Sequence, residues 1–412
     1  MALDRRGFLK SSAAGLTALG AYAFHPRPGL ADYASLSPEA LPEGVRQTAE
    51  LHALDGKLPL IKRTWRPPNY ETPVAYFDEL YTPDEAFFVR YHLSAIPEVT
   101  ADKWTLSLSG DVAKPLQFNL EELKREFPQT EMTALCLCAG NQRGLLLPPH
   151  APGVQWGHGA MGNARWKGVR LRDVLLRAGL SAKTVEVAFG GADSGVLDKT
   201  ADFVKSLPTN KAMDENTLIA FEMNGKPLPH WNGFPARLVV PGWAASYWLK
   251  HLTSITALTQ PQDSYWMQKS YRMPKGLFPH ADAFPTHETE DSVTLTTLPV
   301  NSLILHPLAG ETVKRSERIN LKGLAWDGGH GIARVDISLD QGRSWLEAKL
   351  GENMGRYAWR PWSFSFQAQT VGDQPVLARA TNALGDTQPM EAIQNPSGYY
   401  QNAVQQLLLR VI

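Results

Sequence analysis

The sequence predicts an α+β domain followed by an antiparallel β-sandwich, and three observations lead to this prediction. The chain has 412 residues, more than the usual domain size of about 100–200 residues. Helical spacing at residues 171–176 lies between apolar runs typical of strands. From about Leu295 the chain changes to short alternating strands separated by turns. We therefore assign residues 84–290 to the first domain and residues 291–412 to a sandwich of about seven strands.

The charge balance argues against nucleic acid as a partner. Lys plus Arg equals Asp plus Glu, at 41 each, so the formal net charge is zero. A protein that binds nucleic acid nonspecifically usually carries a basic excess, and an acidic excess would instead favour disorder.

The N-terminus contains the pair Arg5-Arg6, followed by a mildly apolar run over residues 11–24. This pattern is typical of a twin-arginine export signal. A chance arginine pair and a membrane anchor are the alternatives, but the run is shorter than the roughly 20 residues that span a bilayer. We expect a signal peptide over residues 1–31, no membrane span after its removal, and a periplasmic protein.

Residues 32–83 are rich in proline and lack clear periodicity, as in Arg66-Pro67-Pro68. We expect this segment to be an extended arm with short helical pieces that wraps the first domain. The following run, residues 85–92, is expected to form an apolar strand.

Both cysteines of the chain lie in one short apolar run at residues 133–138. The run predicts a buried strand, in which Cys136 and Cys138 point to the same face. Ala139-Gly140-Asn141 predicts the turn that ends it. Both thiols could be small core side chains. Alternatively, Arg143 could lower the pKa of a nearby thiol, and a thiolate at Cys138 would then be a soft metal ligand.

The stretch Cys138-Ala139-Gly140-Asn141-Gln142-Arg143 resembles the Cys-x-Gly-Asn-x-Arg motif of the sulfite oxidase family of molybdenum enzymes. The resemblance implies that Cys138 binds molybdenum together with the dithiolene sulfurs of molybdopterin, a pyranopterin. It also implies a sulfite-oxidase-type molybdopterin-binding domain followed by an immunoglobulin-like β-sandwich through which the family dimerises, here expected as a homodimer.

The segment Phe88-Val89-Arg90-Tyr91-His92 resembles the family motif Phe-x-Arg-Asn-His. On the residues alone, a surface arginine and a satisfied histidine would be the default. The resemblance implies that Arg90 contacts the substrate and His92 the pterin. Tyr91 stands where many members have asparagine.

Residues 156–166 form a predicted glycine-rich loop. Because the loop lacks the strand-before, helix-after G-x-G-x-x-G order and a Walker lysine, we exclude nucleotide binding. The resemblance implies that Trp156 lies in the substrate pocket, although a buried core tryptophan is a serious alternative. Asp193 follows a predicted strand at residues 184–191, and it either stabilises the turn or contacts the pterin.

The segment Asn232-Gly233-Phe234-Pro235-Ala236-Arg237 resembles the family stretch His-Gly-Phe-Pro-x-Arg, with Asn232 in place of the histidine. A planar guanidinium suits a phosphate, and Arg237 matches the family's phosphate-binding arginine. The implied cofactor-binding residues are Phe88, Arg90, His92, Cys138, Asp193, Asn232, Arg237, Tyr247, Trp248 and Lys250.

The loop at residues 266–271 resembles the one that brings the family's active-site tyrosine, here Tyr271, to the metal. Sulfite is a small divalent anion, and guanidinium groups can replace its hydration in a partly closed pocket. Arg90, Arg143 and an arginine of the C-terminal domain would form this cage, with Arg360 as the candidate and Arg356 as the alternative. The implied catalytic residues are Arg90, Arg143, Tyr271, Trp156 and Arg360.

The resemblance implies a sulfite dehydrogenase that converts sulfite and water to sulfate. A sulfane dehydrogenase, a sulfoxide reductase of the same fold, and a binding protein without turnover are the alternatives. With two cysteines, the chain has no C-x-x-C-H haem attachment and too few thiolates for a four-cysteine iron–sulfur cluster. We therefore expect no haem in this chain and a separate c-type cytochrome as the electron acceptor.

Overall fold

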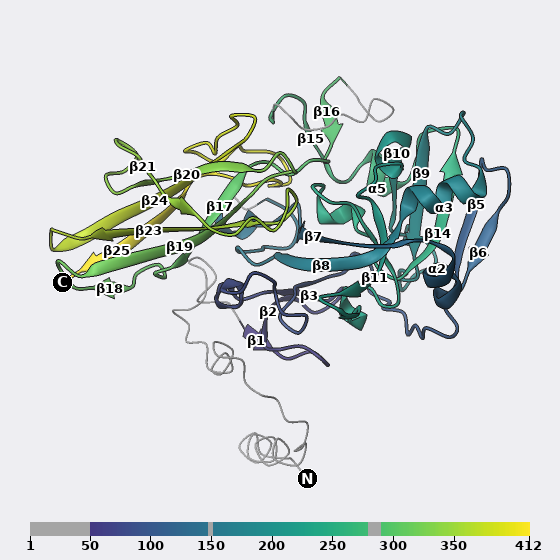
Figure 1. Ribbon diagram of the computed structural model, residues 1–412, viewed down its shortest axis with the longest axis horizontal. Helices are drawn as coiled ribbons and strands as arrows, with labels where there is room; N and C mark the ends of the chain where they lie inside the picture. Colours follow the sequence, from purple (N-terminus) through teal and green to yellow (C-terminus); the bar gives the residue numbers. More distant parts are fainter. Residues whose placement is uncertain (1–49, 147–150, 279–289) are drawn as a thin grey trace, which may run out of the picture. The chain divides into compact units, whose positions relative to one another are not determined.

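The computed structural model describes residues 50–146, 151–278 and 290–412 (Figure 1). All of them belong to one compact unit that spans Ser37–Ile412. The predicted export signal, residues 1–31, lies outside the described residues. No helix among those described has the length and apolar character needed to cross a bilayer.

The described part of the predicted arm forms strands rather than an extended wrap. Strands β1 (Glu50–His52), β2 (Leu60–Thr64), β3 (Asn69–Glu71) and β4 (Val89–Arg90) make one sheet in that order. The strands are held by a small buried cluster that includes Leu60, Tyr70 and Val89. The only helical piece described in this arm is the 3₁₀ turn η3 (Val74–Phe77).

The strand predicted at residues 85–92 is limited to β4. The preceding residues form a turn, because the Ala86 and Phe87 amides donate to the carbonyls of Pro83 and Asp84. This turn lets the apolar side chains of Phe87 and Phe88 both pack inward; the two rings stack with centroids 5.5 Å apart.

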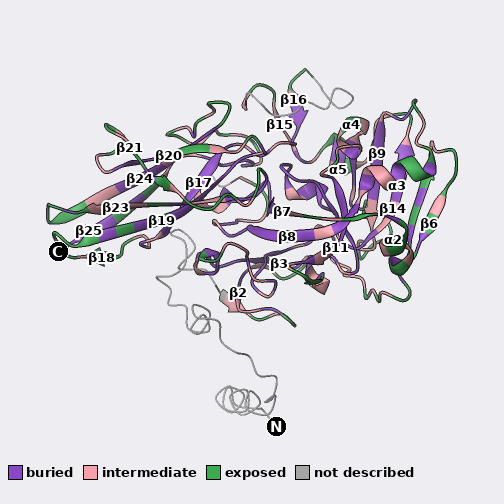
Figure 2. Cartoon of the chain, viewed as in Figure 1, coloured by how far each residue is buried: buried purple, intermediate pink, exposed green. Residues whose placement is uncertain are grey.

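A second sheet carries the predicted cysteine strand. Strands β12 (Lys226–Pro227), β11 (Leu218–Met223), β8 (Met161–Arg170) and β7 (Gln129–Leu137) pair in that order, and β13 (Arg237–Val239) pairs with β11. The strand prediction is confirmed, with Cys136 opposite Gly162. The predicted loop at 156–166 instead becomes strand β8 from Met161, and β8 is largely buried in Figure 2. A Cβ atom at Gly162 would collide with the ring of Phe87, so glycine is required for this close packing.

The third sheet has the order β10 (Val204–Pro208), β9 (Glu186–Gly191), β14 (Leu252–Leu258), β5 (Leu106–Gly110) and β6 (Leu116–Phe118). The helical spacing at residues 171–176 corresponds to α3 (Leu171–Ala178), and a second helix is α2 (Leu120–Glu126). Asn119 caps α2 in a capping box with Glu122. Short helical turns near the third sheet and the cavity are α4 (Thr209–Ala212), α5 (Tyr265–Gln268), η4 (Arg143–Leu145), η5 (His230–Asn232) and η6 (Ala245–Tyr247).

The short pair β15 (Arg272–Pro274) and β16 (Ser292–Thr294) precedes the sandwich. One sandwich sheet has the order β17 (Asn301–His306), β19 (Arg318–Trp326), β23 (Arg360–Gln367), β22 (Lys349–Leu350). The other has the order β18 (Thr312–Val313), β25 (Gln405–Val411), β24 (Gly372–Asn382), β20 (Ile332–Ser338), β21 (Leu346–Glu347). The predicted sandwich is confirmed, and the strands beyond the expected seven are two-residue pieces such as β18 and β21. Inward side chains of both sheets, among them Leu321, Ile337 and Leu409, form its core.

Candidate active site

Strand ends and loops of the first domain line a cavity that is partly open to solvent. Ten of the fourteen implied catalytic and cofactor-binding residues line it: Phe88, Arg90, His92, Cys138, Asp193, Asn232, Arg237, Trp248, Lys250 and Tyr271. Arg143, Trp156, Tyr247 and Arg360 are not among the lining residues. Residues more than 180 positions apart in the sequence therefore meet at one cavity, which is the arrangement expected of a cofactor or substrate site.

Cys138 directly follows the last residue of β7, and hydrogen bonds of its backbone amide and carbonyl hold it in place. Its amide donates to Ala160 O at 2.9 Å, and its carbonyl accepts from the Asn141 amide at 2.9 Å. Cys136 lines the same cavity, with its Sγ 4.0 Å from the Arg237 guanidinium. Burial raises the pKa of Cys136 to about 11, so this thiol stays protonated at neutral pH.

A molybdopterin group fits the donors that the protein provides. The described residues contain no cluster of three or more His, Cys, Asp or Glu side chains that could hold a metal alone. A metal bound by Cys138 would therefore take its other ligands from an organic group, as a dithiolene can supply. The remaining question is whether the cavity also accommodates an anionic tail.

Arg237 provides a buried positive charge for such a tail. Its guanidinium is buried and donates to the carbonyls of Asn232 at 2.9 Å and Trp248 at 2.9 Å, while its Nε has no hydrogen-bond partner. No carboxylate forms an ion pair with it among the described residues. A buried cation with a spare donor suits a phosphate, because charge-assisted bonds to phosphate are strong.

Lys250 and Asp193 lie in the same cavity. Burial lowers the pKa of Lys250 well below its usual value, and the nearby Asp193 carboxylate opposes that shift. Burial likewise raises the pKa of Asp193. Lys250 Nζ donates to Trp231 O at 3.3 Å and lies over the Tyr91 ring. An anion bound here would stabilise the protonated form of Lys250.

The two departures from the family motifs have local explanations. Tyr91 directs its hydroxyl to His251 Nε2, at 2.7 Å, and not to the side chains around Cys138. Asn232 lines the cavity, but each of its amide atoms has a protein partner: Oδ1 accepts from Lys57 Nζ at 2.5 Å and Nδ2 donates to Phe88 O at 3.1 Å. The Asn232 amide thus serves to hold the cavity wall.

Arg90, His92 and Tyr271 meet at one point. The Tyr271 hydroxyl hydrogen-bonds to His92 Nε2 and lies 3.5 Å from an Arg90 terminal nitrogen. Burial lowers the pKa of His92 well below its usual value, and the Arg90 and Lys250 charges lower it further. His92 is therefore neutral at physiological pH, and its hydrogen bond orients the Tyr271 hydroxyl.

Arg143 lies behind Tyr271 rather than in the cavity lining. Its Nε donates to Ser397 O at 2.7 Å, and its guanidinium lies 5.0 Å from the Tyr399 ring centroid. The Tyr399 ring stacks on Tyr271 at 5.4 Å. The C-terminal domain thus reaches the site with an aromatic segment, residues 397–400. The only sequence signal for it is the tyrosine pair 399–400, which follows Gly398.

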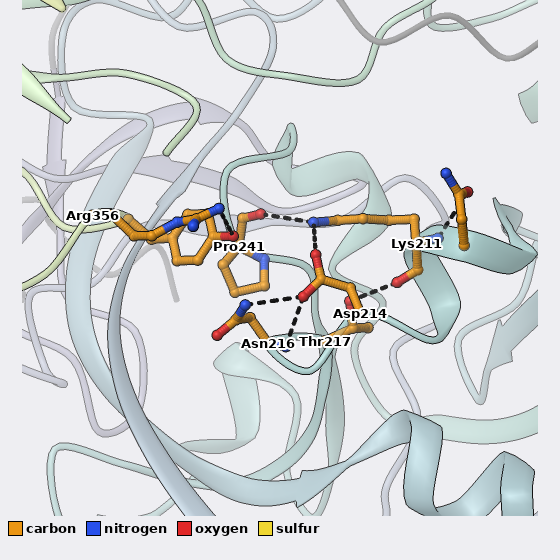
Figure 3. A network of polar contacts seen from close by, with 8 residues as sticks. Lys211, Asp214, Asn216, Thr217, Pro241 and Arg356 are labelled. Atoms are coloured by element: carbon orange, nitrogen blue, oxygen red, sulfur yellow. Dashed lines mark hydrogen bonds and ion pairs between the residues drawn. The ribbon is translucent and has the colours of Figure 1, made fainter. Parts of the chain in front are cut away.

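The structure does not bring the predicted third arginine to the cavity. Arg360 lies in β23, where its Nε donates to Gly351 O at 2.9 Å. Arg356 donates to the Tyr357 hydroxyl at 2.8 Å, close to the network of Lys211, Asp214 and Pro241 (Figure 3). Backbone pairing of β23 with β19 fixes Arg360 opposite Ala325, inside the sandwich sheet.

Trp156 and Tyr247 are core residues beside the site. Trp156 is 1% exposed, and its carbonyl accepts from the Gly144 amide at 2.8 Å. Trp156 is therefore a buried core tryptophan, which was the alternative to a place in the substrate pocket. Tyr247 is fully buried, with its ring 4.5 Å from the Nζ of Lys205.

Lys205, which sequence reasoning missed, is fully buried behind Tyr271. Its Nζ donates to Trp266 O at 2.8 Å and lies 5.3 Å from the Tyr271 ring centroid. Burial, together with the Arg272 charge, lowers the pKa of Lys205 to about 7. Only its place in the apolar run 203–207 distinguishes it from an ordinary surface lysine.

This lysine predicts a pH dependence of stability. The unfolded chain holds the Lys205 proton up to about pH 10.5 and the folded protein only to about pH 7, so the unfolded state binds more protons between these values. The contribution of Lys205 to the unfolding free energy therefore rises with pH across that window, by at most about 1.4 kcal/mol per pH unit. We expect Lys205→Met to flatten this slope in urea unfolding curves, whereas Lys211→Met, which removes a partly exposed lysine, should keep it. An identical slope in Lys205→Met and the parent would contradict a lowered pKa.

Comparisons with known proteins agree with this geometry. Residues 92–266 match the family profile described as "Oxidoreductase molybdopterin binding domain", and residues 292–411 match the "Mo-co oxidoreductase dimerisation domain". Mitochondrial sulfite oxidase from Homo sapiens is 38% identical over 381 residues, covering 88% of this chain and 67% of that protein. The Drosophila melanogaster protein of the same name is 35% identical, with 84% of this chain and 62% of that protein covered. The chain thus spans about two thirds of these relatives.

A solved structure shows the same fold over most of the chain. The crystal structure of the sulfane dehydrogenase SoxCD from Paracoccus pantotrophus aligns with a TM-score of 0.70. It covers 93% of this chain and 95% of that chain at 24% sequence identity.

Proposed function

Since the chain belongs to the sulfite oxidase family of molybdopterin oxidoreductases, we propose that it oxidises sulfite to sulfate at the cavity around Cys138. The reaction takes sulfite and water to sulfate, two protons and two electrons. The observation that carries the proposal is the meeting of Arg90, His92 and Tyr271 at a cavity that Cys138 also lines.

Cys138 would hold the molybdenum, and Arg237 and Lys250 would hold the anionic end of the pterin. When bound, the molybdenum group supplies oxygen-atom transfer and accepts the two electrons. Arg90 binds the sulfite oxygens, because its guanidinium replaces the water that the anion loses in a closed site. Its contacts with Asn69 Oδ1, at 3.2 Å, and with the Tyr91 carbonyl keep it in place.

Tyr271 and His92 form a hydrogen-bonded pair beside the substrate. The Tyr271 hydroxyl can donate to an oxygen of the substrate or product, and burial raises the pKa of Tyr271 so that it remains protonated at neutral pH. The hydrogen bond with the neutral His92 holds this hydroxyl in position. Arg143 and Tyr399 support the other side of the Tyr271 ring.

The electrons leave to another molecule, and we propose a separate c-type cytochrome because the two-cysteine sequence offers no haem attachment motif. The N-terminal arginine pair favours export by the twin-arginine pathway and a periplasmic location. Residues 292–411, which match the dimerisation domain, favour a homodimer.

Sulfite-dependent reduction of ferricyanide tests the activity. We expect about one molybdenum per chain and two ferricyanide molecules reduced per sulfate formed, because ferricyanide accepts one electron. Sulfane sulfur serves as a comparison substrate with ferricyanide, and sulfoxides, which take up electrons, are compared at equal concentration with a reduced dye as the electron donor. Full molybdenum content with turnover of one of these, and none of sulfite, would assign the protein to a different reaction of the same fold.

The acceptor is tested in the same assay with cytochrome c. Encounters between electron-transfer partners are small and often guided by charge. We expect turnover with cytochrome c to fall with ionic strength more steeply than turnover with ferricyanide. Oxygen reduction at a comparable rate, with no gain on adding cytochrome c, would make the protein an oxidase.

A further inference from the structure

Lys57 is a buried cation of the N-terminal segment that the proposed reaction does not use. It lies between β1 and β2 with 8% of its surface exposed. Its Nζ donates to three acceptors: Asp84 O at 2.6 Å, Phe87 O at 3.0 Å and Asn232 Oδ1 at 2.5 Å. Three acceptors match the three protons of an ammonium group, so the geometry fits the charged form.

These acceptors belong to two separate segments that line the cavity. Phe87 lies in the turn that leads to Arg90, and Asn232 lies in η5, shortly before Arg237. Asn232 extends the connection, because its carbonyl accepts from Arg237 and its Nδ2 donates to Phe88 O at 3.1 Å. The Lys57 ammonium therefore links the segment that positions Arg90 with the segment that positions Arg237.

The burial of Lys57 is costly and calls for a compensating role. Desolvation lowers its pKa to about 7, while the charges of Asp84 and Glu85 oppose the shift. No carboxylate forms an ion pair with Lys57 in the part of the chain that the structure describes. A methionine would fill similar space without this desolvation cost but could not bridge the two segments.

We propose that Lys57 is a positioning residue for the cofactor, joining the two walls of the cavity so that the N-terminal segment controls how long molybdopterin is retained. The proposal rests on the proposed function only for the identity of the cofactor, and it holds whichever substrate is oxidised. Lys57 acts through Asn232 and Phe87 and does not itself line the cavity.

Lys57→Met tests the proposal by removing the three donors while keeping an unbranched side chain. We expect the variant to release its pterin on the order of tenfold faster or more, since it loses hydrogen bonds from a charged donor. Release is followed by pterin fluorescence and by molybdenum analysis after gel filtration. Lys62→Met, on the neighbouring strand β2, is the matched control and should release the pterin at the parental rate.

Thermal unfolding separates cofactor retention from general stability. A bound cofactor stabilises only the folded state, so the Tm difference between loaded and cofactor-free protein reports its affinity. We expect this difference to shrink in Lys57→Met. A variant that releases pterin at the parental rate, or whose loaded and free forms lose equal Tm, would show that Lys57 only packs and would overturn the proposal.

A variant that does not fold and a parent protein without cofactor lead to different conclusions. If Lys57→Met does not fold, Lys57→Gln, which keeps two N–H donors, should fold and release pterin at an intermediate rate; parental release from it would equally overturn the proposal. If the parent protein contains neither molybdenum nor pterin when produced by a host that makes the cofactor, the proposed function fails first and the role of Lys57 falls with it.

Discussion

Replacement of Cys138 by serine should leave the protein without molybdenum and without turnover, whereas Cys136→Ser should retain both. A serine hydroxyl is a harder and poorly ionised donor, so it cannot replace a thiolate on this metal. Both sulfurs line the cavity. They differ in position, because Cys136 lies within β7 beside Arg237 with a raised pKa, and Cys138 lies just beyond the strand end.

Molybdenum per chain and sulfite-dependent ferricyanide reduction measure the two variants side by side. Cys136→Ser should lose some stability, because a hydroxyl is buried where a thiol packed. Metal retained by Cys138→Ser and lost by Cys136→Ser would place the metal on the other sulfur.

Arg90→Gln should raise the KM for sulfite strongly, while Arg360→Gln should leave it unchanged. Removing a charged donor from a closed anion site costs about 2–4 kcal/mol, which corresponds to a fall of about 30-fold to 1,000-fold in kcat/KM. Arg360 is a matched control, because its guanidinium bonds to a carbonyl within the sandwich and does not line the cavity. Sulfite titrations at constant ionic strength provide the comparison.

Two results would change this assignment. An unchanged KM in Arg90→Gln would make Arg90 a structural residue that supports Asn69 and the Tyr91 carbonyl. A raised KM in Arg360→Gln would show that β23 contributes to the substrate site from a position outside this cavity.

The parts of the site that the sequence predicted are those carried by short continuous motifs. Cys138 was implied by the resemblance of the segment 138–143 to a family motif, and Arg90 and His92 by the resemblance of one five-residue segment. A short apolar run predicted the cysteine-bearing part of β7, and period-two alternation predicted much of the sandwich, because a strand's buried face is determined locally.

Local sequence patterns do not show the placement of residues that depends on distant partners. Arg360 was a reasonable candidate for an anion site until strand pairing fixed it in the sandwich sheet. Lys57 gave no sequence signal, because lysine is normally exposed and its acceptors lie 27, 30 and 175 residues away. Asn232 stands where the family motif has histidine, and its partner in the N-terminal segment determines what its amide contacts.

The contact of Arg143 with Ser397 has a consequence for biosynthesis. The two residues are 254 positions apart, so a ribosome must add that length of chain after Arg143 before the contact can form. Tyr399, which packs on Tyr271, emerges at the same late stage. The support behind Tyr271 is therefore completed only after most of the sandwich has been translated. A ribosome that stalls within the sandwich therefore leaves a nascent chain in which Arg143 and Tyr271 lack these partners.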